Sequence, residues 1–156
     1  MKIIGIISIP LALAVVAGCG DQSWKRNSDG VTVQVADRYN DGPALVRLQV
    51  KGDNLVRVTA TPETQFTDRK SLIIVPSESK PEFTVRPTDS TVSVITSSVI
   101  ASVRLRDGAV SFADKDGSTI LGGNTMSFIP ITVEGRHEYS SLFTFDSPQD
   151  EAFYGL

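Results

Sequence analysis

The sequence of 156 residues contains a single cysteine, Cys19, and a single histidine, His137. One cysteine cannot form an intramolecular disulfide, so a disulfide framework does not hold this fold together. One histidine cannot supply a histidine-rich metal site. The sequence also lacks a glycine-rich phosphate loop, a nucleophile elbow and a histidine zinc motif. These absences leave no residue to nominate as a catalytic group or a metal ligand, and no cofactor is expected.

An excess of basic residues is also lacking. The chain has 15 Lys and Arg against 18 Asp and Glu, for a net charge of −3. A nucleic-acid partner is therefore not expected, because neutralising phosphates requires a concentrated basic surface. Hydrophobic residues make up 40% and charged residues 21% of the chain, which is typical of a folded domain and not of a disordered one.

A long apolar run is missing as well. The apolar stretch over residues 3–18 contains Pro10 and is shorter than the roughly 20 residues that a membrane-spanning helix needs. Lys2 precedes this stretch, and a charge followed by a short apolar segment is the layout of an export signal. The sequence therefore predicts a signal peptide over residues 1–18.

The residues that end the signal are informative. Val16-Ala17-Gly18-Cys19 resembles a bacterial lipobox, in which the cysteine thiol is acylated. We expect lipidation at Cys19, a membrane partner through this anchor, and a location in the cell envelope, either periplasmic or on the cell surface. An ordinary signal peptide or a membrane stub is the alternative. With Cys19 assigned to lipid, no cysteine remains for a Cys/His nucleophile pair.

A polar segment follows the anchor. Residues 20–28 read GDQSWKRNS and show no apolar periodicity, so we expect a tether over residues 19–29. Trp24 within it could stack on a sugar ring, rest at the membrane interface or pack on the domain.

The rest of the chain, residues 30–156, alternates apolar and polar residues with a period of two, which indicates antiparallel strands. Asp107-Gly108 and Asp116-Gly117 separate such runs and are strong hairpin signals. The prolines 76, 81 and 87 should keep their stretch at an edge or in a loop. No 3.6-residue period appears outside the signal, so we predict an all-β antiparallel sandwich. The expected strands are residues 31–35, 44–50, 55–60, 92–96, 99–105, 109–113, 118–121, 126–133 and 142–145, with a further apolar run at 71–75.

Three polar groups were weighed as functional sites. His137 lies in the polar segment 134–138, where we expect a solvated turn. The sequence 114–117, DKDG, resembles the start of a calcium loop, but threonines stand where that loop needs glycine and glutamate, so we expect an exposed hairpin turn. The acidic pairs Asp114/Asp116 and Asp150/Glu151 are interpreted as solvated turn charges, because adjacency in sequence does not create a glycosidase carboxylate pair.

The carboxyl-terminal segment carries a family resemblance. Residues 142–145 (LFTF) and 150–156 (DEAFYGL) resemble the strand, acidic turn and aromatic-Tyr-Gly-Leu motif near the end of the amino-terminal sandwich of family 31 glycoside hydrolases. Residues 45–60 (LVRLQVKGDNLVRVTA) are similar to an early hairpin of that family. Residues 94–121 (VITSSVIASVRLRDGAVSFADKDGSTIL) resemble its double hairpin. The order and spacing of the three motifs favour membership, notably among bacterial α-xylosidase-like proteins.

The resemblance implies a galactose-mutarotase-like sandwich beside a catalytic barrel that acts on α-linked oligosaccharides. The barrel and its two carboxylates follow this segment in relatives, so no catalytic residue is carried over. The motif residues are interpreted as structural; they are Glu151, Phe153, Tyr154, Gly155 and Leu156.

The comparison further implies a partial sandwich. We expect residues 30–156 to leave a strand edge and part of an apolar face uncovered. The resulting hypothesis is a non-catalytic domain fragment of an α-xylosidase or α-glucosidase. The alternative is a stand-alone β-sandwich lipoprotein that binds carbohydrate or scaffolds envelope proteins, which would need a row of exposed aromatic side chains.

Overall fold

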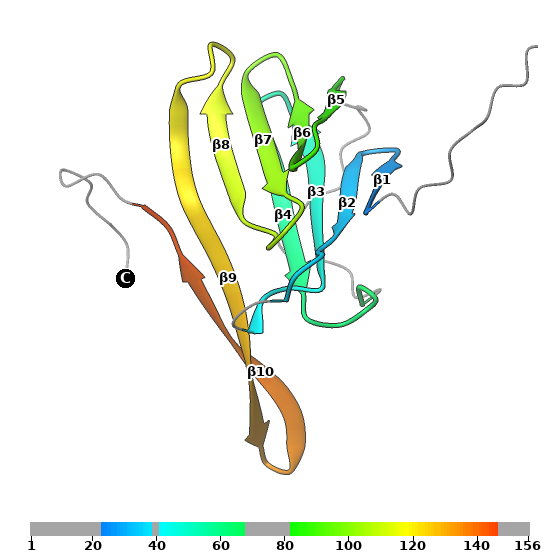
Figure 1. The fold of residues 1–156 in the computed structure, drawn as a ribbon, viewed down its shortest axis with the longest axis vertical. Coiled ribbons are helices and arrows are strands. Elements are labelled where there is room, and N and C mark those ends of the chain that lie inside the picture. Colours follow the sequence, from blue (N-terminus) through cyan, green and yellow to red (C-terminus); the bar gives the residue numbers. More distant parts are fainter. Residues whose placement is uncertain (1–22, 39–40, 68–81, 147–156) are drawn as a thin grey trace, which may run out of the picture.

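A computed structural model describes residues 23–38, 41–67 and 82–146, which form two antiparallel sheets (Figure 1). The strands of the first sheet run in the spatial order β1-β2-β3-β4, and those of the second in the order β10-β9-β8-β7-β6-β5. The first sheet comprises β1 (Trp24–Asn27), β2 (Gly30–Gln34), β3 (Leu45–Gly52) and β4 (Leu55–Thr61). The second comprises β5 (Thr84–Pro87), β6 (Thr91–Ile95), β7 (Val99–Arg104), β8 (Val110–Asp114), β9 (Thr119–Val133) and β10 (Arg136–Thr144).

The core lies between the two sheets and consists mainly of valine. Along β3 the buried positions alternate with half-buried ones, as the period-two pattern predicts. The buried apolar residues are Val31, Val33, Val35, Val46, Leu48, Val50, Val92, Val94, Ala101, Val103, Val110 and Met126. Because these residues come from both sheets, the molecule is a sandwich, which confirms the predicted all-β class.

Polar contacts join the sheets at both ends of the first sheet. At one end, the Thr96 hydroxyl donates a hydrogen bond to the carbonyl of Asp53 in the β3–β4 turn. At the other end, the amide of Ala36 donates to the carbonyl of Leu105 over 3.0 Å. These bonds satisfy backbone groups that would otherwise be unpaired where the strands end.

Both Asp-Gly turns are confirmed. Asp107-Gly108 joins β7 to β8, and Asp116-Gly117 joins β8 to β9. Both glycines have positive φ, the conformation that a side chain disfavours. β5, which ends at Pro87, is an edge strand of the second sheet, as expected for a proline-containing segment.

The end of the second sheet differs from the prediction. The expected strands 118–121 and 126–133 are one continuous strand, β9, which is irregular where it pairs with β8. The expected strand 142–145 is the end of a longer one, β10, which begins at Arg136. The polar segment 134–138 is not a turn as a whole, because Glu134 and Gly135 alone make a two-residue turn with positive φ and the pairing resumes at Arg136.

The expected tether is also shorter than predicted. Trp24–Asn27 form β1, which pairs with β2 at the edge of the first sheet. Trp24 is half-buried and packs against the core, which is one of the three roles considered for it. The polar composition of residues 20–28 wrongly indicated a tether, because an edge strand needs only one apolar face.

Several predictions concern residues outside the described ranges. These are the signal over residues 1–18, Cys19, the apolar run 71–75 and the motif at residues 150–156. In the described part of the chain, no helix is long and apolar enough to cross a membrane.

Gly108 generates a stability prediction. A Cβ atom at this position would lie 2.9 Å from side-chain atoms of Pro43 and Val35, at a φ of +73°. We expect Gly108→Ala to lower the free energy of unfolding by about 1–3 kcal/mol through overpacking, in addition to about 1 kcal/mol of backbone strain. Urea unfolding followed by circular dichroism measures this change.

Gly117→Ala is the matched control, since Gly117 also has positive φ but nothing lies within 4 Å of an added Cβ. Gly117→Ala should lower the free energy of unfolding by the backbone strain alone, about 1 kcal/mol. Equal losses in the two variants would show that the β7–β8 turn is not tightly packed against the first sheet.

Candidate functional site

The carboxylates that were weighed as ligands are occupied in holding turns. Asp114 Oδ1 accepts hydrogen bonds from the amides of Asp116 and Ser118, at 2.9 and 2.8 Å. Lys115 Nζ lies 2.9 Å from Asp116 Oδ1 on the surface. This is the exposed hairpin turn that the sequence predicted. Within the described ranges, no group of three or more His, Cys, Asp or Glu residues could hold a metal ion.

Two further carboxylates have lowered pKa values. Burial by itself would raise the pKa of Asp29, but hydrogen bonds from Lys51 (2.9 Å) and Gln49 (2.8 Å) outweigh it and lower the pKa. Asp107 behaves in the same way, since the hydrogen bond from Arg104 outweighs its burial and its pKa is lowered. A general acid needs a raised pKa, so neither group is suited to act as one.

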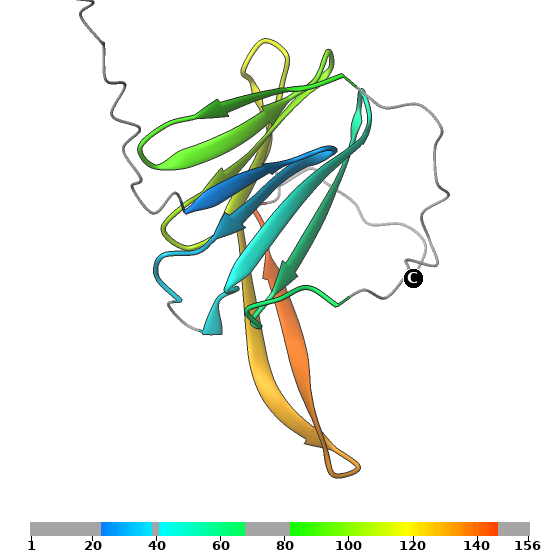
Figure 2. The ribbon, with the colours of Figure 1, turned by 90° about the vertical axis from the view of Figure 1, so that its right-hand side faces the viewer.

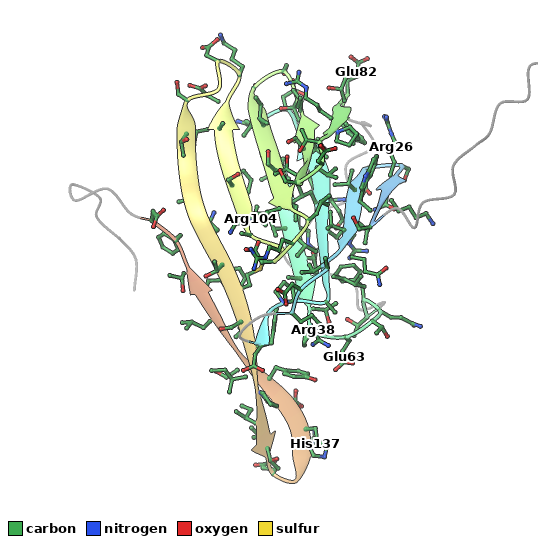
Figure 3. All side chains as sticks on the ribbon, in the orientation of Figure 1. Arg26, Arg38, Glu63, Glu82, Arg104 and His137 are labelled. Atoms are coloured by element: carbon green, nitrogen blue, oxygen red, sulfur yellow. The ribbon has the colours of Figure 1, made fainter. Side chains whose placement is uncertain are left out.

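The sequence predicted that His137 lies in a turn, but it lies in β10 opposite Thr132. Figure 3 shows it near the tip of the hairpin formed by β9 and β10, with its side chain in solvent. The solvated state that the sequence predicted is correct, although the element is different.

The β9–β10 hairpin is the most unusual surface of the described chain. It projects well beyond the other strands of both sheets (Figure 2), and every residue from 129 to 146 is exposed. Isolated exposed apolar residues are common on proteins, but a contiguous group marks an interaction site. The large exposed apolar residues of this region are Ile129, Ile131, Val133, Tyr139, Leu142, Phe143 and Phe145.

The pairing register assigns these side chains to two faces, because directly paired residues of antiparallel strands point the same way. Phe143 pairs with buried Met126 and Tyr139 pairs with Pro130, so these residues lie on the side that continues the sandwich core, which we call the inner face. The opposite side, the outer face, carries the exposed side chains of Ile129, Ile131, Val133 and Leu142. Both faces of the hairpin therefore carry exposed apolar side chains, and the outer face also carries Glu138 and Arg136, opposite Ile131 and Val133.

A glycine bulge lies in β9 just before the strand begins to pair with β10. Gly123 has a φ of +66°, and a Cβ there would come within 3 Å of the Asp146 carboxylate. The Asp146 amide donates to the carbonyl of Gly122 over 3.2 Å. This hydrogen bond ties Asp146, two residues after the end of β10, to the bulge in β9, and bulges of this kind bend a strand.

A side-chain contact links the hairpin to the first sheet. The Tyr139 hydroxyl donates a hydrogen bond to Glu63 Oε1, in the loop after β4, over 2.8 Å. This bond and the charge of Glu63 raise the pKa of Tyr139, against a smaller opposing effect of Arg38. Figure 3 shows Glu63 and Arg38 near the base of the hairpin. The inner face therefore looks towards the end of the sandwich.

The sequence predicted an uncovered edge and apolar face without locating them. β10 is an edge strand of the second sheet, and beyond it no described strand pairs. The available signal was the apolar run at residues 126–133, in which both alternating sets of positions carry apolar residues. The proposed site residues Cys19, Glu151, Phe153, Tyr154, Gly155 and Leu156 lie outside the described residues, so the structure does not place them.

The chain is similar to a known protein domain family and to solved structures. The family model of the glycosyl hydrolase 31 N-terminal galactose mutarotase-like domain matches residues 45–156. The crystal structure of the GH31 α-xylosidase from Xanthomonas citri matches with a TM-score of 0.71 and 36% sequence identity, over 81% of this chain and 14% of that protein. The crystal structure of a GH31 α-xylosidase from a soil metagenome, complexed with xylose, matches with a TM-score of 0.47 and 22% identity, over 64% of this chain and 14% of that protein.

The Tyr139–Glu63 bond gives a pH prediction. A raised folded-state pKa means that the fold favours the neutral phenol, so this stabilisation is present below the unfolded pKa and is lost as the pH rises through the folded pKa. We expect Glu63→Gln to lower the pKa of Tyr139 towards its ordinary value of 10.0. Ultraviolet titration of tyrosinate measures this pKa. Comparison with Tyr139→Phe identifies the part of the titration curve that belongs to this residue.

Glu138→Gln is the control, because Glu138 is an exposed carboxylate of the same hairpin that faces away from Tyr139 in the pairing register. It should leave the high-pH component unchanged. A titration curve that Glu63→Gln does not move would contradict the assigned contact.

Proposed function

Because the chain belongs to family 31 of the glycoside hydrolases, we propose that it forms the non-catalytic N-terminal β-sandwich of an α-glycosidase that hydrolyses O-glycosyl bonds of oligosaccharides. The observation that carries this proposal is the 36% identity with an α-xylosidase over 81% of the chain. The chain spans 14% of the length of that relative. The activity is therefore assigned to a longer protein that contains this domain.

Retaining and inverting glycosidases need two carboxyl groups held about 5–9 Å apart across the sugar. Within the described residues, Asp29, Asp107 and Asp114 are engaged in ion pairs or turn hydrogen bonds instead. Because the chain matches the N-terminal domain of the family and spans 14% of a relative, we assign both catalytic carboxylates to the part of the longer protein outside this chain. Its substrate is an α-linked oligosaccharide, with an α-xyloside favoured over an α-glucoside by the match with the α-xylosidase from Xanthomonas citri.

The motif residues Glu151, Phe153, Tyr154, Gly155 and Leu156 have a structural role in this proposal. An aromatic pair followed by glycine suits close packing where one domain leads into the next. The motif falls within the residues that the family model matches.

The amino terminus supports a second part of the proposal, a lipid anchor. The short apolar stretch of residues 3–18 and the following Cys19 have the pattern of a lipoprotein signal. Acyl chains on Cys19 would hold the enzyme on the surface of a membrane in the cell envelope. β1 begins at Trp24, five residues after Cys19, so the sandwich would lie within roughly 18 Å of the anchor.

Hydrolysis of nitrophenyl α-xyloside tests the activity. The 156-residue chain should show no turnover, because the proposal places the carboxylate pair outside it, whereas a longer protein that contains this domain should hydrolyse this substrate. Nitrophenyl β-xyloside serves as the control for anomeric specificity. Turnover by the 156-residue chain alone, or none by the longer protein on any α-xyloside or α-glucoside, would contradict the proposal.

Cell fractionation tests the anchor. Wild-type protein expressed in a bacterial host should fractionate with membranes, and Cys19→Ala should remove lipidation because alanine offers no thiol to acylate. Incorporation of labelled palmitate measures acylation directly. Gly20→Ala is the matched control, since it changes the neighbouring residue and keeps the thiol; acylation that survives Cys19→Ala would refute the anchor.

A further inference from the structure

We propose that the β9–β10 hairpin is inserted between two surfaces of the longer hydrolase, so that its inner and outer faces are both buried there. This inference rests on the proposed function, since it takes the remaining part of that polypeptide as the partner. It adds that the hairpin contacts this partner on two sides instead of lying on it with one face.

The distribution of apolar side chains carries the inference. A hairpin that lies on a single surface needs one apolar face and keeps the other polar. Here the outer face carries four exposed apolar residues, which are Ile129, Ile131, Val133 and Leu142, and the inner face carries exposed Phe143 and Tyr139. The charged residues of the outer face, Arg136 and Glu138, lie near the tip of the hairpin. A strand that carries apolar residues at successive positions is typical of burial on both faces.

The base of the hairpin is built to hold it in position. The Gly122–Gly123 bulge with Asp146 sits at one side, and the hydrogen bond between Tyr139 and Glu63 ties the inner face to the loop after β4. A hairpin oriented in this way presents its faces to a partner without first losing much conformational freedom. A surface that covers the inner face would also contact the Glu63 loop.

The length of the matching protein and the side chains of the hairpin together favour the longer hydrolase itself as the partner. The matching α-xylosidase is far longer than this chain, which spans 14% of it, so a large part of the polypeptide is available to cover the hairpin. A membrane is a poorer partner, because Glu134, Arg136, His137 and Glu138 gather at the tip and would have to enter the bilayer. A sugar is a poorer partner for the outer face, because the apolar residues there are aliphatic and offer no aromatic ring to stack on.

The test uses the longer hydrolase and places one charge on each face of the hairpin: Ile129→Lys, opposite Ser140, on the outer face and Phe143→Lys on the inner face. Hydrogen exchange of the β9 and β10 amides is the main measurement. Each variant should lose protection by about tenfold or more, because a lysine buried in an apolar interface opens it. Leu55→Lys is the matched control, as Leu55 and Phe143 are equally exposed at 59% and Leu55 lies at the start of β4, away from the hairpin; it should leave the hairpin protected.

The same three substitutions in the 156-residue chain separate docking from intrinsic stability. There the side chains are already in solvent, so the urea midpoint should stay where it is in the unsubstituted chain. A midpoint that falls for the hairpin variants in this chain would attribute the effect to the hairpin itself and overturn the inference.

Three further outcomes would overturn the inference. If only one of the two lysine variants loses hydrogen-exchange protection in the longer protein, the hairpin docks through a single face, and the two-sided insertion is wrong. Protection that depends on protein concentration assigns the hairpin to a second copy, and protection that appears only with phosphatidylglycerol vesicles assigns it to a membrane; both overturn the inference. Turnover of nitrophenyl α-xyloside by the unsubstituted longer protein is measured in parallel, so failure of the proposed function is recognised separately.

Discussion

Packing of one valine-rich face against another is the interaction on which the rest of this structure depends. Val31, Val46 and Leu48 of the first sheet and Val92, Val94 and Val103 of the second are completely buried. Full burial of one such side chain contributes roughly 1.5–3 kcal/mol, so these six residues outweigh any of the surface ion pairs, which contribute about 0–1 kcal/mol each. The branched side chains also suit the extended backbone, so local preference and tertiary packing agree.

The sandwich core has a consequence for the hairpin. The second sheet is longer than the first, and β9 continues past the region where the first sheet can cover it (Figure 1). From residue 129 onward the strands keep their backbone pairing but lose their packing partner. Backbone hydrogen bonds therefore form the hairpin, and in the proposed insertion surfaces of the longer hydrolase cover its side chains.

Much of the fold follows from the sequence by local rules. The alternation of Val31, Val33 and Val35, and the glycines at 108 and 117, set strand faces and turns that the structure confirms. The errors arose where two local signals compete. Residues 134–138 are polar, which favours a turn, yet strand pairing with β9 continues from Arg136 because Glu134 and Gly135 complete a tight turn by themselves. Trp24–Asn27 read as a tether for the same reason, since the edge of a sheet accepts polar residues that pair through their backbone.

For this protein, the sequence alone determined the all-β class, the strand faces of the core, the two Asp-Gly turns and the family resemblance, because each depends on neighbouring residues or on short motifs. Tertiary structure decided which apolar positions stay exposed, that Tyr139 meets Glu63 across 76 residues, and that the uncovered surface has two faces. The physical reason is that a period-two pattern states which side chains share a face, whereas burial depends on what packs against that face from distant parts of the chain.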